Sequence, residues 1–123
     1  MKLLNHTLFI FLFIFVSTQI MAQWGTINGV TSERLFATYT INNQEALIGG
    51  KDGVLFKTSN GGDNWTSVTA TGEDITDIVF IDENTGFMVA GADIFNTSDR
   101  GNSWNSTSIS ADDDLVGVCF PTA

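Results

Sequence analysis

The sequence predicts an all-β fold made of repeated four-stranded antiparallel units, and three observations lead to this prediction. The segment from Thr58 to Trp65 recurs as Thr97 to Trp104, at a spacing of 39 positions. Short apolar runs alternate with clusters of Gly, Asn and Asp, and Pro121 is the only proline. No stretch sustains a helical period. A repeat of about 40 residues is typical of folds in which similar units stack on one another.

The first unit spans residues 35–70 and the second spans residues 73–110. Apolar runs in the first unit lie at residues 35–39, 46–48, 54–56 and 65–68. The second unit repeats them at residues 75–80, 86–90, 94–96 and 104–107. Turn-forming residues separate the runs, so each unit is expected to be a four-stranded meander.

A third unit is expected to begin within residues 114–123. The first strand of the second unit is expected to begin at Ile75 and end at Phe80. Leu115 lies 40 positions after Ile75, and Phe120 lies 40 positions after Phe80. The sequence therefore predicts two complete units and the first strand of a third.

The spacing between the two complete units is not constant. Tyr39 and Phe80 are 41 positions apart, whereas Phe56 and Phe95 are 39 positions apart. This difference predicts two extra residues in the first unit, in the turn at residues 49–53. A turn accepts added residues without shifting the register of the flanking strands.

The repeated segment has the chemistry of a turn. Asp or Asn at its third place can accept hydrogen bonds from backbone N–H groups about two residues further on. Gly at its fifth place can adopt a positive φ angle. Thr at the first place ends one strand, and Trp at the eighth place begins the next and covers the turn; stacking of a sugar ring on the Trp is the alternative. The structural positions are Thr58, Asn60, Gly62 and Trp65 in the first copy and Thr97, Asp99, Gly101 and Trp104 in the second.

Residues 1–22 resemble a cleavable secretory signal, and residues 23–34 form a lead-in to the first unit. The apolar run at residues 8–16 is about half the length that a membrane-spanning helix needs, and a polar stretch closes it. Ala22 is small enough to precede the cleavage site, so the mature chain is expected to start at Gln23. This predicts export to the periplasm, the cell surface or the medium.

Charge and composition exclude several function classes. Fourteen acidic residues against five basic ones give a net charge of −9, which argues against a nucleic-acid partner. Asp112 to Asp114 are expected to form a solvated loop, with a cation site as the alternative. The only histidine, His6, lies in the signal, so His-based acid/base, triad and metal chemistry is not expected in the mature part. No catalytic, cofactor-binding or metal residue is predicted. Cys119, the only cysteine, is expected to be a buried strand residue.

The repeated segments resemble Asp-box repeats, also called bacterial neuraminidase repeats. With the preceding Gly and aromatic pattern and the strand that follows, residues 35–123 are similar to the β-propeller of the photosystem II stability and assembly factor family. The second segment fits the Asp-box pattern fully, whereas the first has Asn60 in place of Asp. The resemblance implies about two propeller blades and the first strand of a third, and therefore an incomplete propeller.

The family resemblance implies an exported, non-catalytic scaffold that binds a protein or cell-surface partner. For the photosystem factor, binding uses a basic surface patch, and this chain has no comparable cluster. We expect a fragment of a longer protein, with further blades supplied by a longer chain or by other copies. The alternative is a fragment of a sialidase-like glycoside hydrolase, which needs clustered arginines and paired carboxylates. The mature chain offers only Arg34 and Arg100. Carbohydrate stays an alternative ligand.

Overall fold

A computed structural model describes residues 30–109 and 112–121, which form two four-stranded antiparallel sheets. The first sheet contains β1 (Leu35–Thr40), β2 (Ala46–Gly50), β3 (Leu55–Thr58) and β4 (Thr66–Ser67), with the 3₁₀ turn η1 (Lys51–Gly53) between β2 and β3. The second sheet contains β5 (Ile75–Phe80), β6 (Gly86–Ala90), β7 (Asp93–Thr97) and β8 (Asn105–Ser108).

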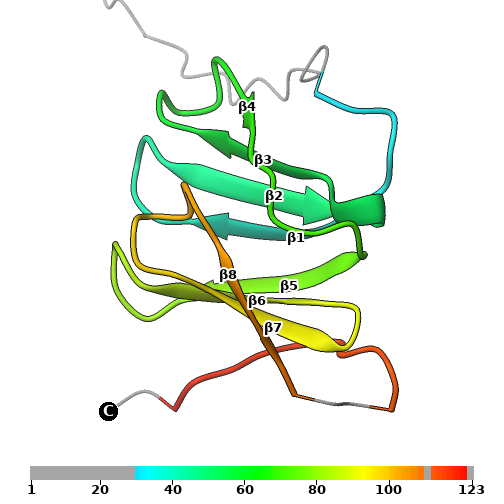
Figure 1. The fold of residues 1–123 in the computed structure, drawn as a ribbon. Coiled ribbons are helices and arrows are strands. Elements are labelled where there is room, and N and C mark those ends of the chain that lie inside the picture. The colour runs from blue at the N-terminus through cyan, green and yellow to red at the C-terminus, as the bar shows by residue number, and fades with distance from the viewer. Residues whose placement is uncertain (1–29, 110–111, 122–123) are drawn as a thin grey trace, which may run out of the picture.

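Each sheet is a meander, because every strand pairs with the next one along the chain. The two sheets lie one above the other as layers, with β1 and β5 in contact (Figure 1). The predicted all-β class is confirmed, and the stacked meanders have the arrangement of neighbouring propeller blades. No helix in the described part of the chain is long and apolar enough to cross a membrane.

The pairing register shows which residues of the two sheets are equivalent. Thr40 pairs with Ala46 as Phe80 pairs with Gly86, so the offset along the first two strands is 40 and not 41. The prediction of two extra residues in the first unit is therefore wrong. The N–H of Gly50 bonds to the carbonyl of Val54 with three residues between them, whereas the equivalent Ala90 pairs with Asp93 with two residues between them, so there is one extra residue.

Alternation along the strands gives the first sheet two different faces. One face turns toward the second sheet and includes Tyr39, Leu47, Leu55 and Lys57. The other face has no sheet against it in the described structure, and we call it the open face. Its residues are Thr38, Thr40, Ala46, Ile48, Phe56, Thr58 and Ser67, which follow from the pairings of β1 to β4.

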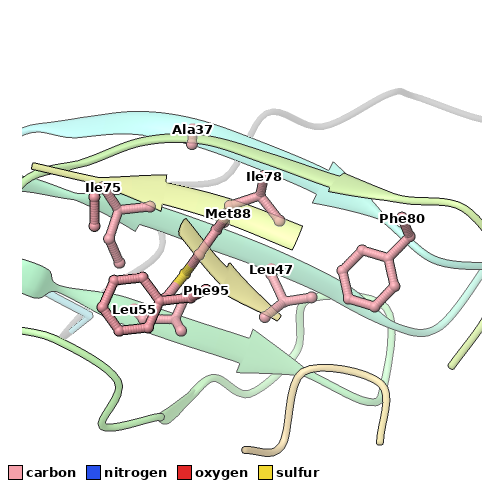
Figure 2. Close-up of a cluster of buried hydrophobic side chains, with 9 residues drawn as sticks. Ala37, Leu47, Leu55, Ile75, Ile78, Phe80, Met88 and Phe95 are labelled. Carbon is pink, nitrogen blue, oxygen red and sulfur yellow. The ribbon is translucent and has the colours of Figure 1, made fainter. Parts of the chain in front are cut away.

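The hydrophobic core lies between the two sheets (Figure 2). Leu47 and Leu55 enter it from the first sheet, and they meet Ile75, Ile78 and Met88 from the second. Leu47, Ile75 and Met88 are 0% exposed. Full burial of such a side chain contributes about 1.5–3 kcal/mol to the free energy of unfolding, so this layer is the main stabilising contact between the sheets.

Residues 112–121 lie along the face of the second sheet that is remote from the first sheet (Figure 1). The backbone N–H of Leu115 donates to the carbonyl of Gly91 at 2.8 Å, and Phe120 packs on Phe87 with ring centroids 4.7 Å apart. No strand is assigned here because no second strand pairs with this segment among the described residues. A third blade starting within residues 114–123 stays a prediction.

The structure overturns the prediction of a buried Cys119. Its side chain is exposed, while its neighbour Val118 is half-buried and donates its backbone N–H to Asp77 Oδ2 at 2.9 Å. The segment rests on the second sheet with only one side, and Cys119 lies on the side that faces solvent. The apolar neighbours of Cys119 in sequence could not reveal this, because nothing described covers the outer side.

Candidate functional site

Threonine side chains organise both repeated turns. Thr58 ends β3 and Thr97 ends β7, and each is almost completely buried. The hydroxyl oxygen of Thr58 accepts a hydrogen bond from the N–H of Gly62 at 2.9 Å, and that of Thr97 accepts one from the N–H of Gly101 at 2.9 Å. Each threonine thus satisfies a backbone donor that the tight turn would otherwise leave without a partner.

The side chain at the third place spans the turn. Asn60 Oδ1 accepts hydrogen bonds from the Thr58 hydroxyl at 3.0 Å and from the N–H of Asn64 at 2.9 Å. In the second copy, Asp99 Oδ1 accepts from the Thr97 hydroxyl at 2.8 Å and from the N–H of Ser103 at 2.9 Å. The backbone donor lies four residues further on, and not about two as the sequence suggested.

A carboxylate in the second turn makes one contact that the amide of the first turn lacks. Asp99 Oδ2 accepts a hydrogen bond from the Ser103 hydroxyl at 2.6 Å. This bond and the bond from the Ser103 backbone lower the pKa of Asp99 to about 2. Asn60 is neutral, so only the second turn depends on ionisation.

Two consecutive residues in each turn have a positive φ angle. The values are 70° and 97° for Gly61 and Gly62, and 62° and 76° for Arg100 and Gly101. The sequence pointed only to the fifth place, because a large side chain stands at the fourth place of the second copy. Gly61 in the first copy is the residue that could have indicated a positive φ angle at the fourth place. A non-glycine residue with a positive φ angle, such as Arg100, costs roughly 1 kcal/mol.

The two tryptophans occupy equivalent places but differ in their contacts. Trp104 packs edge-on against Phe80, with centroids 6.2 Å apart, and its Nε1–H donates to the carbonyl of Gly101 at 3.2 Å. Trp65 Nε1 is buried and has no hydrogen-bond partner in the described structure. Both side chains are half-buried, with Trp104 packed against the core.

A polar cluster joins the second turn to the first sheet. Glu45 Oε2 lies 3.1 Å from Arg100 Nη1, and Glu45 Oε1 lies 3.3 Å from Lys57 Nζ. Lys57 Nζ also donates to Asn102 Oδ1 at 3.0 Å, and the Lys57 residue is only 8% exposed. Sequence reasoning missed this cluster, because its members lie far apart in the chain.

The ionisation of Glu45 follows from its neighbours. Burial raises the pKa of this carboxyl, but hydrogen bonds from Asn42 and Lys57 and the charges of Lys57 and Arg100 outweigh burial, so the net pKa lies below the usual value. Arg100 also contacts Glu83 at 3.4 Å and donates from Nε to Asn84 Oδ1 at 3.1 Å. Its guanidinium therefore connects the two sheets.

Other charged groups do not gather into a site. Asp112, Asp113 and Asp114 are exposed. Within residues 30–109 and 112–121, no three His, Cys, Asp or Glu side chains come close enough to hold a metal ion. The predicted signal and most of the lead-in lie outside the described residues.

The open face differs from its counterpart in the second sheet. There, the equivalent residues Ile78, Met88 and Phe95 are 3%, 0% and 6% exposed, because the first sheet covers them. On the open face, Thr38 is exposed, and Ile48 and Phe56 are half-buried. Chemically this face offers apolar contacts and hydroxyl groups.

The chain is similar in fold to the solved structure "YCF48 bound to D1 peptide", in which YCF48 is a photosystem II assembly factor with a β-propeller fold. The TM-score is 0.60 at 20% sequence identity, and the match covers 67% of this chain and 29% of that chain. This chain thus matches less than a third of its neighbour's length. No protein-family model and no curated protein sequence matches the chain. The structural likeness supports a β-propeller-like fold.

Proposed function

We propose that the chain is a non-catalytic binding scaffold whose open face receives a polypeptide partner. The observation behind this proposal is the contrast between the two sheets. Ile48 and Phe56 stay partly exposed, whereas the equivalent Met88 and Phe95 are buried. Uncovered apolar surface on a sheet marks an interaction site when it is contiguous, and Ile48 and Phe56 are direct cross-strand neighbours.

The likeness to YCF48 supports a polypeptide as the partner class. That propeller is described with a bound D1 peptide, and the choice of a polypeptide here rests on this fold-level analogy together with the open face. The net charge of −9 favours a neutral or basic partner, because an acidic one would be repelled.

The two sheets are further proposed to be part of a larger propeller. The match covers 29% of the YCF48 chain, and the first sheet has one face uncovered in the described structure. Further blades would come from a longer chain or from other copies, and such blades would compete with a separate partner for the same face. Repeats of this kind gain stability mainly from contacts between neighbours.

Export and the lack of catalysis are part of the same proposal. The signal-like residues 1–22 support export, and a mature protein that starts at Gln23 in the periplasm or medium would test it by mass spectrometry. Support for a non-catalytic role comes from Arg100, whose guanidinium is engaged by Glu45 and Glu83. The Asp-box assignment of the two turns stays part of this proposal.

Selection of peptides from a random library on the immobilised full chain tests the binding function, followed by titration calorimetry with the selected peptides. The variant Thr38→Lys places a charge on the open face beside Ile48 and is expected to weaken binding at least about tenfold. Thr69→Lys, an exposed position after β4, is the matched control and should bind like the parent. Failure to select any binder, or equal binding by Thr38→Lys, would overturn the proposal.

A further inference from the structure

A hollow of about 170 Å³ opens on the first sheet beside Trp65. It lies over the open-face residues of the first hairpin and the repeated turn. Residues that line it include Thr40, Ala46, Thr58, Gly61, Gly62 and Trp65. The indole Nε1 of Trp65 is buried and without an acceptor in the described structure. A buried donor without a partner costs roughly 1–3 kcal/mol, so this wall of the hollow is incomplete.

The second sheet shows how the same place looks when it is filled. Leu47, from the first sheet, fits against Gly101 so closely that a methyl group on Gly101 would come within 2.9 Å of Leu47 Cδ2. Leu47 is 0% exposed, and Trp104 Nε1 beside it donates to the carbonyl of Gly101. In this sheet a leucine fills the site, and the tryptophan donor is satisfied.

One difference between the repeats makes the hollow of the first sheet roomier, because Thr40 stands where the second sheet has Phe80. Phe80 lies over Gly86, where a methyl group would come within 2.8 Å of the ring. The pairing register places Thr40 and Ala46 at the equivalent positions of the first sheet. No equivalent of Leu47 reaches the open face from the described residues, so both the aromatic group and the leucine are missing there.

We infer that this hollow, bounded by Thr40, Ala46, Gly62 and Trp65, is a docking hole for a leucine side chain on an extended strand of the polypeptide partner. Leu47 in the equivalent place is the template for the side chain, and the interface between the two sheets is the template for the strand. In the filled site the donor of Trp104 is satisfied by its own turn, at the carbonyl of Gly101, so the partner is asked only to fill the hollow. The inference rests on the proposed function and names the residue that the partner inserts.

The test uses a blocked hexapeptide with the sequence of residues 44–49, Gln-Glu-Ala-Leu-Ile-Gly, and the same peptide with alanine in place of leucine. The readout is the indole ¹H–¹⁵N resonance of Trp65 in the full chain, assigned with Trp65→Phe. We expect the leucine peptide to shift this resonance with a dissociation constant of about millimolar, and the alanine peptide to bind about 10- to 100-fold more weakly.

Two variants complete the experiment. Ala46→Leu fills the hollow from within and should abolish the shift, whereas Thr69→Leu, which adds the same side chain at an exposed position outside the hollow, should not. If Ala46→Leu fails to fold, Trp65→Phe replaces the indole that lines the hollow by a smaller phenyl ring, and should weaken peptide binding measured by calorimetry.

Equal shifts with both peptides, or no shift with either, would overturn the leucine hole. Library peptides that still require Thr38 but do not compete with the leucine peptide would leave the scaffold function standing and overturn this inference alone. A dependence of the Trp65 shift on protein concentration without peptide would identify a second copy as the occupant and would also overturn it.

Discussion

Tyr39 and Phe80 stack across the boundary between the two sheets, with ring centroids 5.2 Å apart and planes at 28°. The hydroxyl of Tyr39 donates a hydrogen bond to the carbonyl of Phe80 at 3.1 Å. Their spacing of 41 positions exceeds the structural offset of 40 by one residue, and one residue moves a side chain to the other face of a strand. They meet because stacked sheets present opposite faces to each other.

Removal of the Tyr39 hydroxyl should weaken this boundary. We expect Tyr39→Phe to lower the free energy of unfolding by about 1 kcal/mol, because the hydrogen bond to Phe80 is lost while the stacking stays. Tyr39→Leu should cost more, because the aromatic contact is lost as well. Urea denaturation of the full chain measures both variants, and an unchanged midpoint for Tyr39→Phe would contradict the prediction.

The hydroxyl group of Thr97, in the second turn, should contribute more to stability than the volume of its side chain. Thr97→Val keeps the volume but removes the acceptor of the buried Gly101 N–H, so we expect a loss of about 1–3 kcal/mol in the free energy of unfolding. Thr97→Ser keeps the hydroxyl and should recover most of this loss. A valine variant as stable as the serine variant would show that the turn does not need the bond.

The stability of the second turn should depend on acid. The pKa of Asp99 is about 2 in the folded chain and about 3.9 when unfolded, so the unfolded chain takes up the proton first. The contribution of Asp99 is complete above about pH 4 and is lost as the pH falls through about 2. Asp99→Asn should flatten this part of the pH profile in thermal unfolding. An identical profile for both proteins from about pH 5 to 2 would contradict the assignment.

The two tryptophans should respond differently to the same change. Trp104→Phe removes the hydrogen bond to Gly101 and should lower the free energy of unfolding by about 1 kcal/mol. Trp65→Phe removes a buried donor that has no partner in the described structure, so it should leave the stability unchanged or raise it. Parallel denaturation of the two variants is the measurement, and equal losses would contradict the difference between the turns.

Glu45 should stabilise the contact between the sheets through its charge. Glu45→Gln leaves the buried ammonium of Lys57 without its counter-charge. We expect a loss of about 2 kcal/mol in the free energy of unfolding, a value between those for exposed and for buried ion pairs. Glu83→Gln is the matched control, because the Glu83 side chain is 60% exposed and its pair with Arg100 contributes little. Similar effects of the two variants would contradict a special role for Glu45.

Local patterns predicted much of the fold and little of the candidate site. The repeated turns follow from short-range rules, because Thr97, Asp99 and Gly101 bond within one segment. The polar cluster did not follow, because Glu45 and Arg100 come from different sheets and meet only when the sheets stack. The open face could not be predicted either, since burial depends on which neighbour is present.

The sequence by itself determined the four-stranded units, because alternation, turn residues and the repeat act over a few positions. Only the tertiary structure decided how the units meet. It placed Lys57 in a buried ion pair, left Cys119 exposed, and reduced the inferred two-residue insertion to one. The physical reason is that a matched pair of aromatic residues, such as Tyr39 and Phe80, can be equivalent in the repeat or can face each other across an interface. Sequence spacing alone does not separate the two cases, but the pairing register of the strands does.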